Sequence, residues 1–456
     1  MPQTRLFRSL FVVLVISGCV SAVSNTFAGS SAPANDQSIC DVKSFGAVGN
    51  GVTKDTRAIQ SAIDACAGGH GTVVFSGGRF LSGMISLRSD LTVRLEADAT
   101  LLGSRDDADY PDTAPPTANS QLHNCRKALV YGESLHNVTI TGRGTINGSG
   151  NNPRWVGSGR THPERERPMA VYFTLSDHVT IENIRIRDAA MWTLVTLETD
   201  NVVIRGVDIH SEQGPNRDGI DIVDGHHVLI ENVTVYSEDD AICLKSGSSR
   251  GVDDLIVRNS HVVHSSVAQG LKLGTASTGH FSNVTFENIV IDSVDKAAMA
   301  VESVDGAAID GVIFRNITFQ QAGAAFFMIL GRRGLPGVIG TIDHVRFENI
   351  KGNQTKHAWG SALSGTTVDG IVHAPTNVSF AHVHVTSGGG LSVAPSAPPE
   401  YAGQYPDPNL WGNLPASGLY ARHVEDLSLV DTTFVVTSRD ARPAVVTVDV
   451  TGNPLR

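Results

Sequence analysis

A six-residue motif recurs along most of this 456-residue chain and restricts its fold more than any other feature. The motif begins with Asn, Asp, His or Gly, has apolar residues at its second and fourth positions, and often ends in Asn. Copies begin at Asn137, His178, Asn201, His227, Asp254, Asn283, Gly311, His344, Asn377 and Asp426. Between residues 179 and 378 they follow one another at intervals of 23 to 33 residues. A period of this size is typical of proteins built from stacked structural repeats.

Each repeat has the pattern of short β-strands. The motif is rich in Val, Ile and Thr, alternates with a period of two, and is followed by a turn and a second short strand such as residues 184–186. The repeats show no sustained 3.6-residue pattern, which excludes helical repeats, and a β-propeller would need four strands in each. One unit cannot bury its own apolar face, but stacked units can. The sequence therefore predicts an all-β fold, a single-stranded right-handed parallel β-helix over residues 38–440, with residues 441–456 as a C-terminal tail.

The repeat is capped and interrupted at definite places. Thr56–Ala67 has apolar residues at helical spacing, which predicts a short helix covering the N-terminal end of the stack. Residues 104–128 and 388–420 break the repeat and are expected to form loops beside a groove. Asn-Val-Thr triplets recur within the strand repeat, so we interpret their asparagines as structural residues rather than as glycosylation sites.

The first 28 residues resemble an export signal. Two arginines precede an unbroken apolar run over residues 10–16, which is too short to cross a bilayer as a helix. Residues 26–28 (Thr-Phe-Ala) resemble a signal-peptidase site, whereas residues 16–19 (Ile-Ser-Gly-Cys) resemble a bacterial lipobox that would leave Cys19 acylated. Both alternatives predict an exported bacterial protein, which would be secreted, periplasmic or surface-anchored. The only membrane attachment that we expect is through a lipidated Cys19.

Charge and cysteine content exclude some partners and cofactors. A net charge of −11 argues against a nucleic-acid partner, because phosphate binding needs a basic surface. Cys40 and Cys66 form the most local disulfide candidate, and Cys243 fits a buried thiol within an apolar strand. The cysteines and histidines show no clustered spacing, so we expect no structural zinc site and no cofactor.

Three aspartates stand where the predicted coils bring acidic groups together. Asp218 precedes Asp239 by 21 residues, close to one coil, so the two should lie on neighbouring rungs about 4.8 Å apart. Asp240 follows directly. Glycoside hydrolysis requires two carboxyl groups roughly 5 to 9 Å apart, one protonated and one ionised, and crowding of like charges helps one keep its proton. Turn chemistry explains a lone Asp-Gly pair such as Asp224-Gly225, but the three aspartates together favour catalysis.

These motifs resemble the polygalacturonase family of pectin hydrolases, glycoside hydrolase family 28. Residues 45–60 are similar to the family's opening segment, residues 216–219 (Asn-Arg-Asp-Gly) resemble its Asn-Thr-Asp-Gly motif, and the segment from Asp239 resembles its Asp-Asp motif. The resemblance implies a pectin-lyase-like β-helix and an inverting hydrolase of a plant cell-wall polysaccharide. It also implies that Asp239 is the general acid, and that Asp218 and Asp240 hold and deprotonate the attacking water.

Two departures from the family concern sugar recognition. The chain has Ala268-Gln269-Gly270 in place of Gly-His-Gly, and Ala300-Val301-Glu302 in place of Arg-Ile-Lys. We expect Glu302 to repel a uronate, which favours a neutral sugar or a rhamnogalacturonan-type backbone over homogalacturonan. The alternative is that Glu302 forms a salt bridge with a neighbour such as Lys272 and never meets the substrate. The candidate substrate-binding residues are Asn216, Lys245, Gln269, Lys272, Glu302 and Arg332.

Two alternative functions remain open for the same architecture. A polysaccharide lyase would need an Arg or Lys base and often Ca²⁺, and the column that contains Ala300 and Glu302 lacks that base. A non-catalytic glycan-binding β-helix would tolerate replacement of the three aspartates; a C5 epimerase has only the shared fold in its favour. In each case the partner is a polysaccharide, and we expect a monomer.

Overall fold

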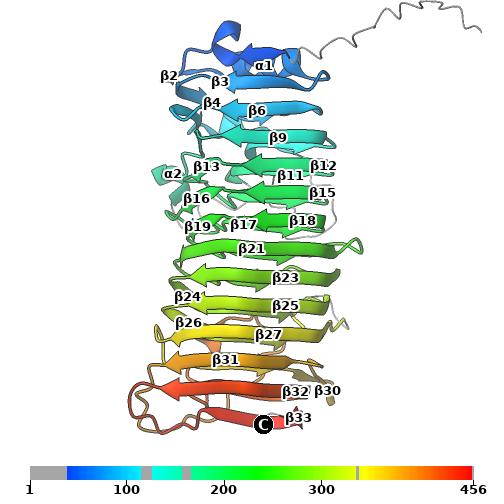
Figure 1. Ribbon diagram of the computed structural model, residues 1–456, viewed down its shortest axis with the longest axis vertical. Coiled ribbons are helices and arrows are strands. Elements are labelled where there is room, and N and C mark those ends of the chain that lie inside the picture. The colour runs from blue at the N-terminus through cyan, green and yellow to red at the C-terminus, as the bar shows by residue number, and fades with distance from the viewer. Residues whose placement is uncertain (1–37, 114–125, 157–165, 335–337, 454–456) are drawn as a thin grey trace, which may run out of the picture. The chain divides into compact units, whose positions relative to one another are not determined.

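The computed structural model describes residues 38–113, 126–156, 166–334 and 338–453. The predicted export signal, with Cys19 and both cleavage sites, lies outside these residues. Residues 37–456 form one compact unit. Within it, 31 strands join one sheet in which the paired strands are parallel, so the predicted parallel β-helix is confirmed. Figure 1 shows the successive coils stacked in chain order.

Three strand ladders run along the stack. The first ladder carries the repeat motif from β9 onward. It consists of β1 (Ile39–Asp41), β3 (Gly71–Phe75), β6 (Leu91–Leu95), β9 (His136–Gly142), β12 (Asp177–Glu182), β15 (Asp200–Arg205), β18 (His226–Glu231), β21 (Val252–Ser265), β23 (His280–Ile291), β25 (Ala308–Phe319), β27 (Thr341–Gln354), β31 (Ser379–Ser387) and β32 (Leu419–Val436). The second ladder is β2 (Asn50–Lys54), β4 (Gly78–Ser82), β7 (Ala99–Gly103), β10 (Thr145–Asn147), β13 (Arg185–Arg187), β16 (Asp208–Ser211) and β19 (Thr234–Ser237), which continues into the second halves of the long strands from β21 on.

The third ladder positions the candidate site. It consists of β5 (Ile85–Ser86), β8 (Ala128–Glu133), β11 (Met169–Thr174), β14 (Leu194–Leu197), β17 (Ile220–Val223), β20 (Ile242–Lys245), β22 (Leu271–Leu273), β24 (Val294–Ser303), β26 (Ala322–Leu330), β28 (Ser361–Ser364), the start of β32, and β33 (Val445–Asn453). A separate antiparallel pair is formed by β29 (Thr366–Val368) and β30 (Ile371–His373).

The apolar positions of the motif form the core, as the alternating pattern predicts. Phe286, Phe314, Phe347 and Phe380 occupy the same motif position in successive coils, and their rings stack at centroid distances of 4.9, 5.2 and 4.7 Å. All four are buried. Each buried side chain of this size stabilises the fold by roughly 1.5 to 3 kcal/mol, and stacking every coil on the next adds to this along the whole chain.

The polar ends of the motif form tight turns. Asn259, Asn288, Asn316 and Asn349 close the motif with φ between 51° and 55°, a left-handed conformation that asparagine tolerates better than most residues. Their side chains link neighbouring coils. From Asn288 on, each Nδ2 donates to the side-chain Oδ1 of the preceding asparagine at 3.0 to 3.1 Å. We call these four residues the asparagine ladder. Asn137 and Asn283, which head two of the Asn-Val-Thr triplets, likewise donate to aspartates of the preceding coil.

The two ends of the stack differ from each other. At the N-terminal end, α1 (Thr56–Cys66) buries Ile59, Ala62 and Ile63 against the core, and Cys40 is disulfide-bonded to Cys66, as predicted. At the C-terminal end, β33 pairs with β32, so the ladder extends into the residues that the sequence assigned to a tail. That assignment was wrong because the last strand lacks a copy of the motif.

The helices are few and short. Besides α1 these are α2 (Pro153–Val156), α3 (Pro408–Trp411) and the 3₁₀ turns η1 (Val42–Phe45) and η2 (Asp107–Asp109). Within the described ranges, none has the length and apolar character needed to cross a membrane. Helix α3 lies in the segment between β31 and β32, which we call the 388–418 loop. Of the predicted loop over 104–128, residues 114–125 lie outside the described part.

Candidate active site

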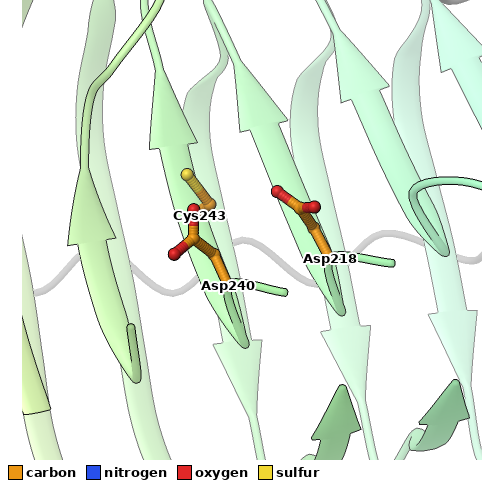
Figure 2. A group of neighbouring side chains, drawn as sticks. All are labelled: Asp218, Asp240 and Cys243. Carbon is orange, nitrogen blue, oxygen red and sulfur yellow. The ribbon is translucent and has the colours of Figure 1, made fainter. Parts of the chain in front are cut away.

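Two of the three predicted aspartates face each other across adjacent coils. Asp218 lies two residues before β17 and Asp240 two residues before β20, and these strands pair with Ile220 opposite Ile242. Figure 2 shows the two carboxyl groups on neighbouring strands. One oxygen of each lies within 4.8 Å of the other and of the Cys243 Sγ. The sequence placed Asp218 on the rung beside Asp239, but the register pairs it with Asp240.

A glycine allows the two coils to approach here. Gly219 follows Asp218 directly, and a Cβ at this position would lie 2.4 Å from the backbone oxygen of Ala241 on the next coil. The backbone N–H of Gly219 donates to the Asp240 carbonyl oxygen at 2.9 Å. The Asp-Gly pair therefore serves both the packing of the coils and the placement of the carboxyl group.

Asp240 is held in its ionised form. Its Oδ2 accepts a 2.8 Å hydrogen bond from the Lys272 ammonium on the next coil, and its Oδ1 accepts one of 3.1 Å from the backbone N–H of Gln269. Burial works to raise the pKa of Asp240, but Lys272 and then Lys245 outweigh it and hold that pKa below its usual value. Asp240 can therefore accept a proton from a bound water.

Asp239 retains its proton more readily than its neighbour. Burial, and then the negative charge of Asp240, raise the pKa of Asp239. Its side chain is half-buried, whereas those of Asp218 and Asp240 are buried, so it is the most accessible of the three aspartates. The preceding Glu238 has a pKa raised to about 7 by burial and by Asp239. A protonated, accessible carboxyl group beside an ionised one is the arrangement that acid–base hydrolysis needs.

A fourth aspartate, which the sequence analysis did not single out, adjoins the three. Asp221 is completely buried and lies in register with Cys243. Burial raises its pKa to about 7, although Lys245, with Nζ 3.7 Å from its Oδ1, opposes this shift. Burial and then Asp221 raise the pKa of Asp218 well above its usual value. These closely spaced groups cannot all be ionised together, so the cluster shares protons.

Comparison with known proteins agrees with this geometry. The model of "Glycosyl hydrolases family 28" matches residues 66–251, and that of "Right handed beta helix region" matches residues 169–354. A probable polygalacturonase from Vitis vinifera is 27% identical over 302 residues, which cover 62% of this chain and 61% of that protein. Residues 66–251, which contain all three aspartates, are thus similar to glycosyl hydrolase family 28. The chain spans about three fifths of the length of the Vitis vinifera relative.

Two further proteins that this chain resembles differ in the activity that their names state. A probable rhamnogalacturonase E from Aspergillus flavus is 23% identical over 346 residues, which cover 67% of this chain and 72% of that protein. The structure of a family 28 exopolygalacturonase from Yersinia enterocolitica superposes with a TM-score of 0.71 and 18% identity, covering 92% of this chain and 79% of that one. At this identity the superposition establishes the shared fold alone.

Gln269 and Glu302, which replace residues of the family motifs, have buried side chains that a sugar could not reach. Gln269 is 1% exposed; its amide donates to Glu302 at 3.2 Å and accepts from the backbone N–H of Ala297 at 2.9 Å. Glu302 has no exposed surface and lies 3.5 Å from the Lys272 ammonium. Assigning Gln269 and Glu302 to substrate contact was therefore wrong, and so was the expected direct repulsion of a uronate by Glu302. The alternative, a salt bridge between Glu302 and Lys272, is the arrangement that the structure shows.

Lys272 supports Asp240 and has almost no exposed surface with which to bind a substrate. It is 2% exposed, and its ammonium contacts Asp240, Glu302 and, at 3.1 Å, the hydroxyl of Tyr405. Burial works to lower the pKa of Lys272, but Asp240 and Glu302 together raise it well above its usual value. Lys272 is thus permanently charged and fixes the orientation of Asp240.

The other predicted binding residues are also engaged with protein groups. Lys245 is 5% exposed, donates to the Cys243 sulfur at 3.1 Å and lies 4.9 Å from the centre of the Trp192 ring. Arg332 pairs with the exposed Asp369 at 3.0 Å. Asn216 adopts φ 59°, and its Oδ1 accepts from the buried Arg167 guanidinium at 2.8 Å. Of the six predicted binding residues, Asn216 therefore lies next to the aspartates and is partly exposed, whereas Lys245 is buried beside them.

A metal ion does not suit the aspartate pair. Asp218, Asp240 and Cys243 have the spacing of a metal-binding group. However, Lys272 donates to Asp240 and Lys245 to Cys243. A cation would have to displace both ammonium groups, so we assign no metal to this site.

Proposed function

We propose that this protein hydrolyses glycosidic bonds in a pectic polysaccharide with inversion at the anomeric carbon. The observation that carries the proposal is the opposite proton affinity of two adjacent carboxyl groups. Asp240 is kept ionised by Lys272, whereas burial and Asp240 itself keep the proton on Asp239. The similarity to glycosyl hydrolase family 28 supports the reaction class.

The reaction assigns one role to each aspartate. Asp239 gives its proton to the oxygen of the leaving sugar as the glycosidic bond breaks. A water held between Asp218 and Asp240 attacks the anomeric carbon from the opposite face and loses its proton to Asp240. Asp239 is then ionised and Asp240 protonated, and proton exchange with solvent restores the starting state. Asp218, whose carboxyl group favours the protonated form, donates a hydrogen bond that orients this water.

A neutral sugar, or a rhamnogalacturonan-type backbone, is the substrate that the charges of the site favour. Two ammonium groups, Lys245 and Lys272, lie here among the carboxyl groups of Asp218, Asp221, Glu238, Asp239, Asp240 and Glu302, and each ammonium already faces a carboxylate. The nearby Arg333 is also neutralised, by Asp305 at 2.6 Å. Because the ammonium groups described at the site already face carboxylates, a galacturonate would add negative charge there, so we propose lower activity on homogalacturonan than on branched pectic fractions.

The test is the release of reducing ends from polygalacturonic acid, rhamnogalacturonan, arabinan and galactan by the purified protein. We expect activity on at least one, with products whose anomeric configuration, followed by NMR at early times, is opposite to that of the substrate. Retention would refute the roles assigned to the aspartates. An unsaturated, ultraviolet-absorbing product would identify a lyase instead. The highest rate on polygalacturonic acid would contradict the preference for less acidic substrates.

A further inference from the structure

The outward face of the third ladder is closed on the C-terminal side of the aspartates. The outward-facing residues in register along β22, β24, β26, β28 and β32 have exposed fractions between 0 and 2%. These residues are Lys272, Ala300, Phe327, Ala362 and Tyr420. A sugar chain that followed the ladder in this direction would find no open surface beyond the coil of Asp240.

The 388–418 loop covers this face. Tyr405 reaches Lys272, one coil beyond Asp240, and the ring of Trp411 packs edge-on against Phe327 with centroids 5.9 Å apart. Trp411 and Leu414 are buried in a cluster with Ala300 and Tyr420. Tyr405 itself remains 42% exposed, so it stands at the rim where the covered face meets solvent.

The loop is fixed at several points along its length. Asp407 pairs with Lys296 at 3.1 Å, and Lys296 has only 14% of its side chain exposed. The Arg422 guanidinium donates to the Pro398 carbonyl oxygen at 2.8 Å and lies 5.4 Å from the centre of the Trp411 ring. These contacts hold the 388–418 loop in a fixed position over the third ladder.

The same outward column is closed on the N-terminal side of the site. Tyr131, Tyr172 and Val195 precede Asp221 in register, and their exposed fractions are 7, 1 and 1%. They belong to a buried apolar cluster with Met169 and Met191. The outward column that contains Asp221 is therefore buried on both sides of the aspartates.

We infer that the enzyme acts at chain ends and releases short products, because a polysaccharide cannot lie across the aspartates in both directions. The inference rests on the proposed hydrolase function and specifies how that function meets its substrate. An enzyme that cuts within chains needs an open surface on both sides of the scissile bond. Here the 388–418 loop ends that surface one coil beyond Asp240.

The test uses oligosaccharides from the most rapidly hydrolysed polysaccharide, labelled with a fluorophore at the reducing end. Chain-end action gives one of two patterns from the first time point: stepwise shortening of the labelled chain, or release of the label on a short fragment alone. Labelled fragments of every intermediate length at the first time point would overturn the inference while leaving the hydrolase intact. Absence of hydrolysis from every substrate would overturn both.

A pair of variants on α3 tests the role of the loop. Trp411→Ala removes the buried ring that packs on Phe327, whereas Leu410→Ala changes an adjacent side chain that is 42% exposed. We expect internal cleavage products from Trp411→Ala and the wild-type pattern from Leu410→Ala. A Trp411→Ala protein with a lowered melting temperature but an unchanged product pattern would show that the 388–418 loop does not prevent internal cleavage.

Discussion

Lys272 donates a 2.8 Å hydrogen bond to Asp240 from the next coil, and this pair decides which of two adjacent aspartates carries a proton. Without the ammonium, burial would favour protonation of Asp240 and Asp239 alike. With it, Asp240 stays ionised and its negative charge helps Asp239 to retain a proton. Glu302 completes the arrangement by contacting Lys272 from the other side.

Replacing Lys272 tests this pairing directly. In Lys272→Met the pKa of Asp240 should rise, so Asp240 loses its negative charge at a higher pH than in the wild type. The acidic limb of the pH–rate profile should move upward by about one to three pH units. Removing one partner of a buried ion pair should also cost about 3 to 5 kcal/mol of stability. An unchanged acidic limb in a folded variant would show that Lys272 does not set the ionisation of Asp240; Lys351→Met, on an exposed face, is the control.

Asp239→Asn should abolish most of the activity with little effect on folding. General acid catalysis contributes about 10²- to 10⁴-fold, and the amide oxygen can still accept from the Asp240 backbone N–H, as the carboxylate does at 2.9 Å. Turnover should therefore fall by at least about 10²-fold, while the melting temperature stays close to that of the wild type. Asp254→Asn, an exposed change on the first ladder, is the matched control. Equal activity of the two variants would refute the assignment of Asp239 as the general acid.

Glu238 should make the protein less stable as the pH rises. Its pKa is about 7 in the folded protein against 4.5 for a free side chain, so the folded state holds a proton that the unfolded chain releases. The resulting stabilisation is complete below pH 4.5 and is lost as the pH rises to about 7. Glu238→Gln should remove this loss, so its melting temperature should exceed that of the wild type increasingly between pH 4.5 and 8. The exposed Glu425→Gln should follow the wild type at every pH; parallel curves for Glu238→Gln would contradict the raised pKa.

The asparagine ladder stabilises the fold through its side-chain hydrogen bonds and through its tolerance of a left-handed backbone, and variants at Asn316 can separate these two effects. Asn316 has φ 54°, donates to Asn288 and accepts from Asn349. Asn316→Ala loses both hydrogen bonds and strains the left-handed backbone, which should cost about 1 to 2 kcal/mol. Asn316→Gly loses the same bonds but tolerates that backbone. In urea unfolding the glycine variant should be the more stable of the two, and the reverse order would show that backbone strain is unimportant here.

The sequence predicted the fold because the motif alternates with the period of a strand and repeats with the period of a coil. It also predicted the place of Asp218, Asp239 and Asp240, since one coil separates them. It offered two places for Glu302, facing a uronate or paired with Lys272, and could not decide between them, because side-chain pairing across coils depends on the register, which here puts Lys272 opposite Ala300. Tyr405 was missed for a similar reason, because it reaches Lys272 from 133 residues further along the chain.

The asparagine ladder also limits where this chain can gain or lose residues during evolution. Each side-chain amide of the ladder must lie within hydrogen-bonding distance of the amide before it. An insertion or deletion within the six-residue motif would therefore break the hydrogen bonds to both neighbouring coils. The connections between the motifs carry no such restriction, and successive motifs are indeed spaced by anything from 23 to 49 residues. Insertions would therefore accumulate in the connections, which include the segment carrying Tyr405 and Trp411. A lineage could in this way reshape the entrance to the aspartates by changing loop length alone, while the coils that hold those aspartates stay the same.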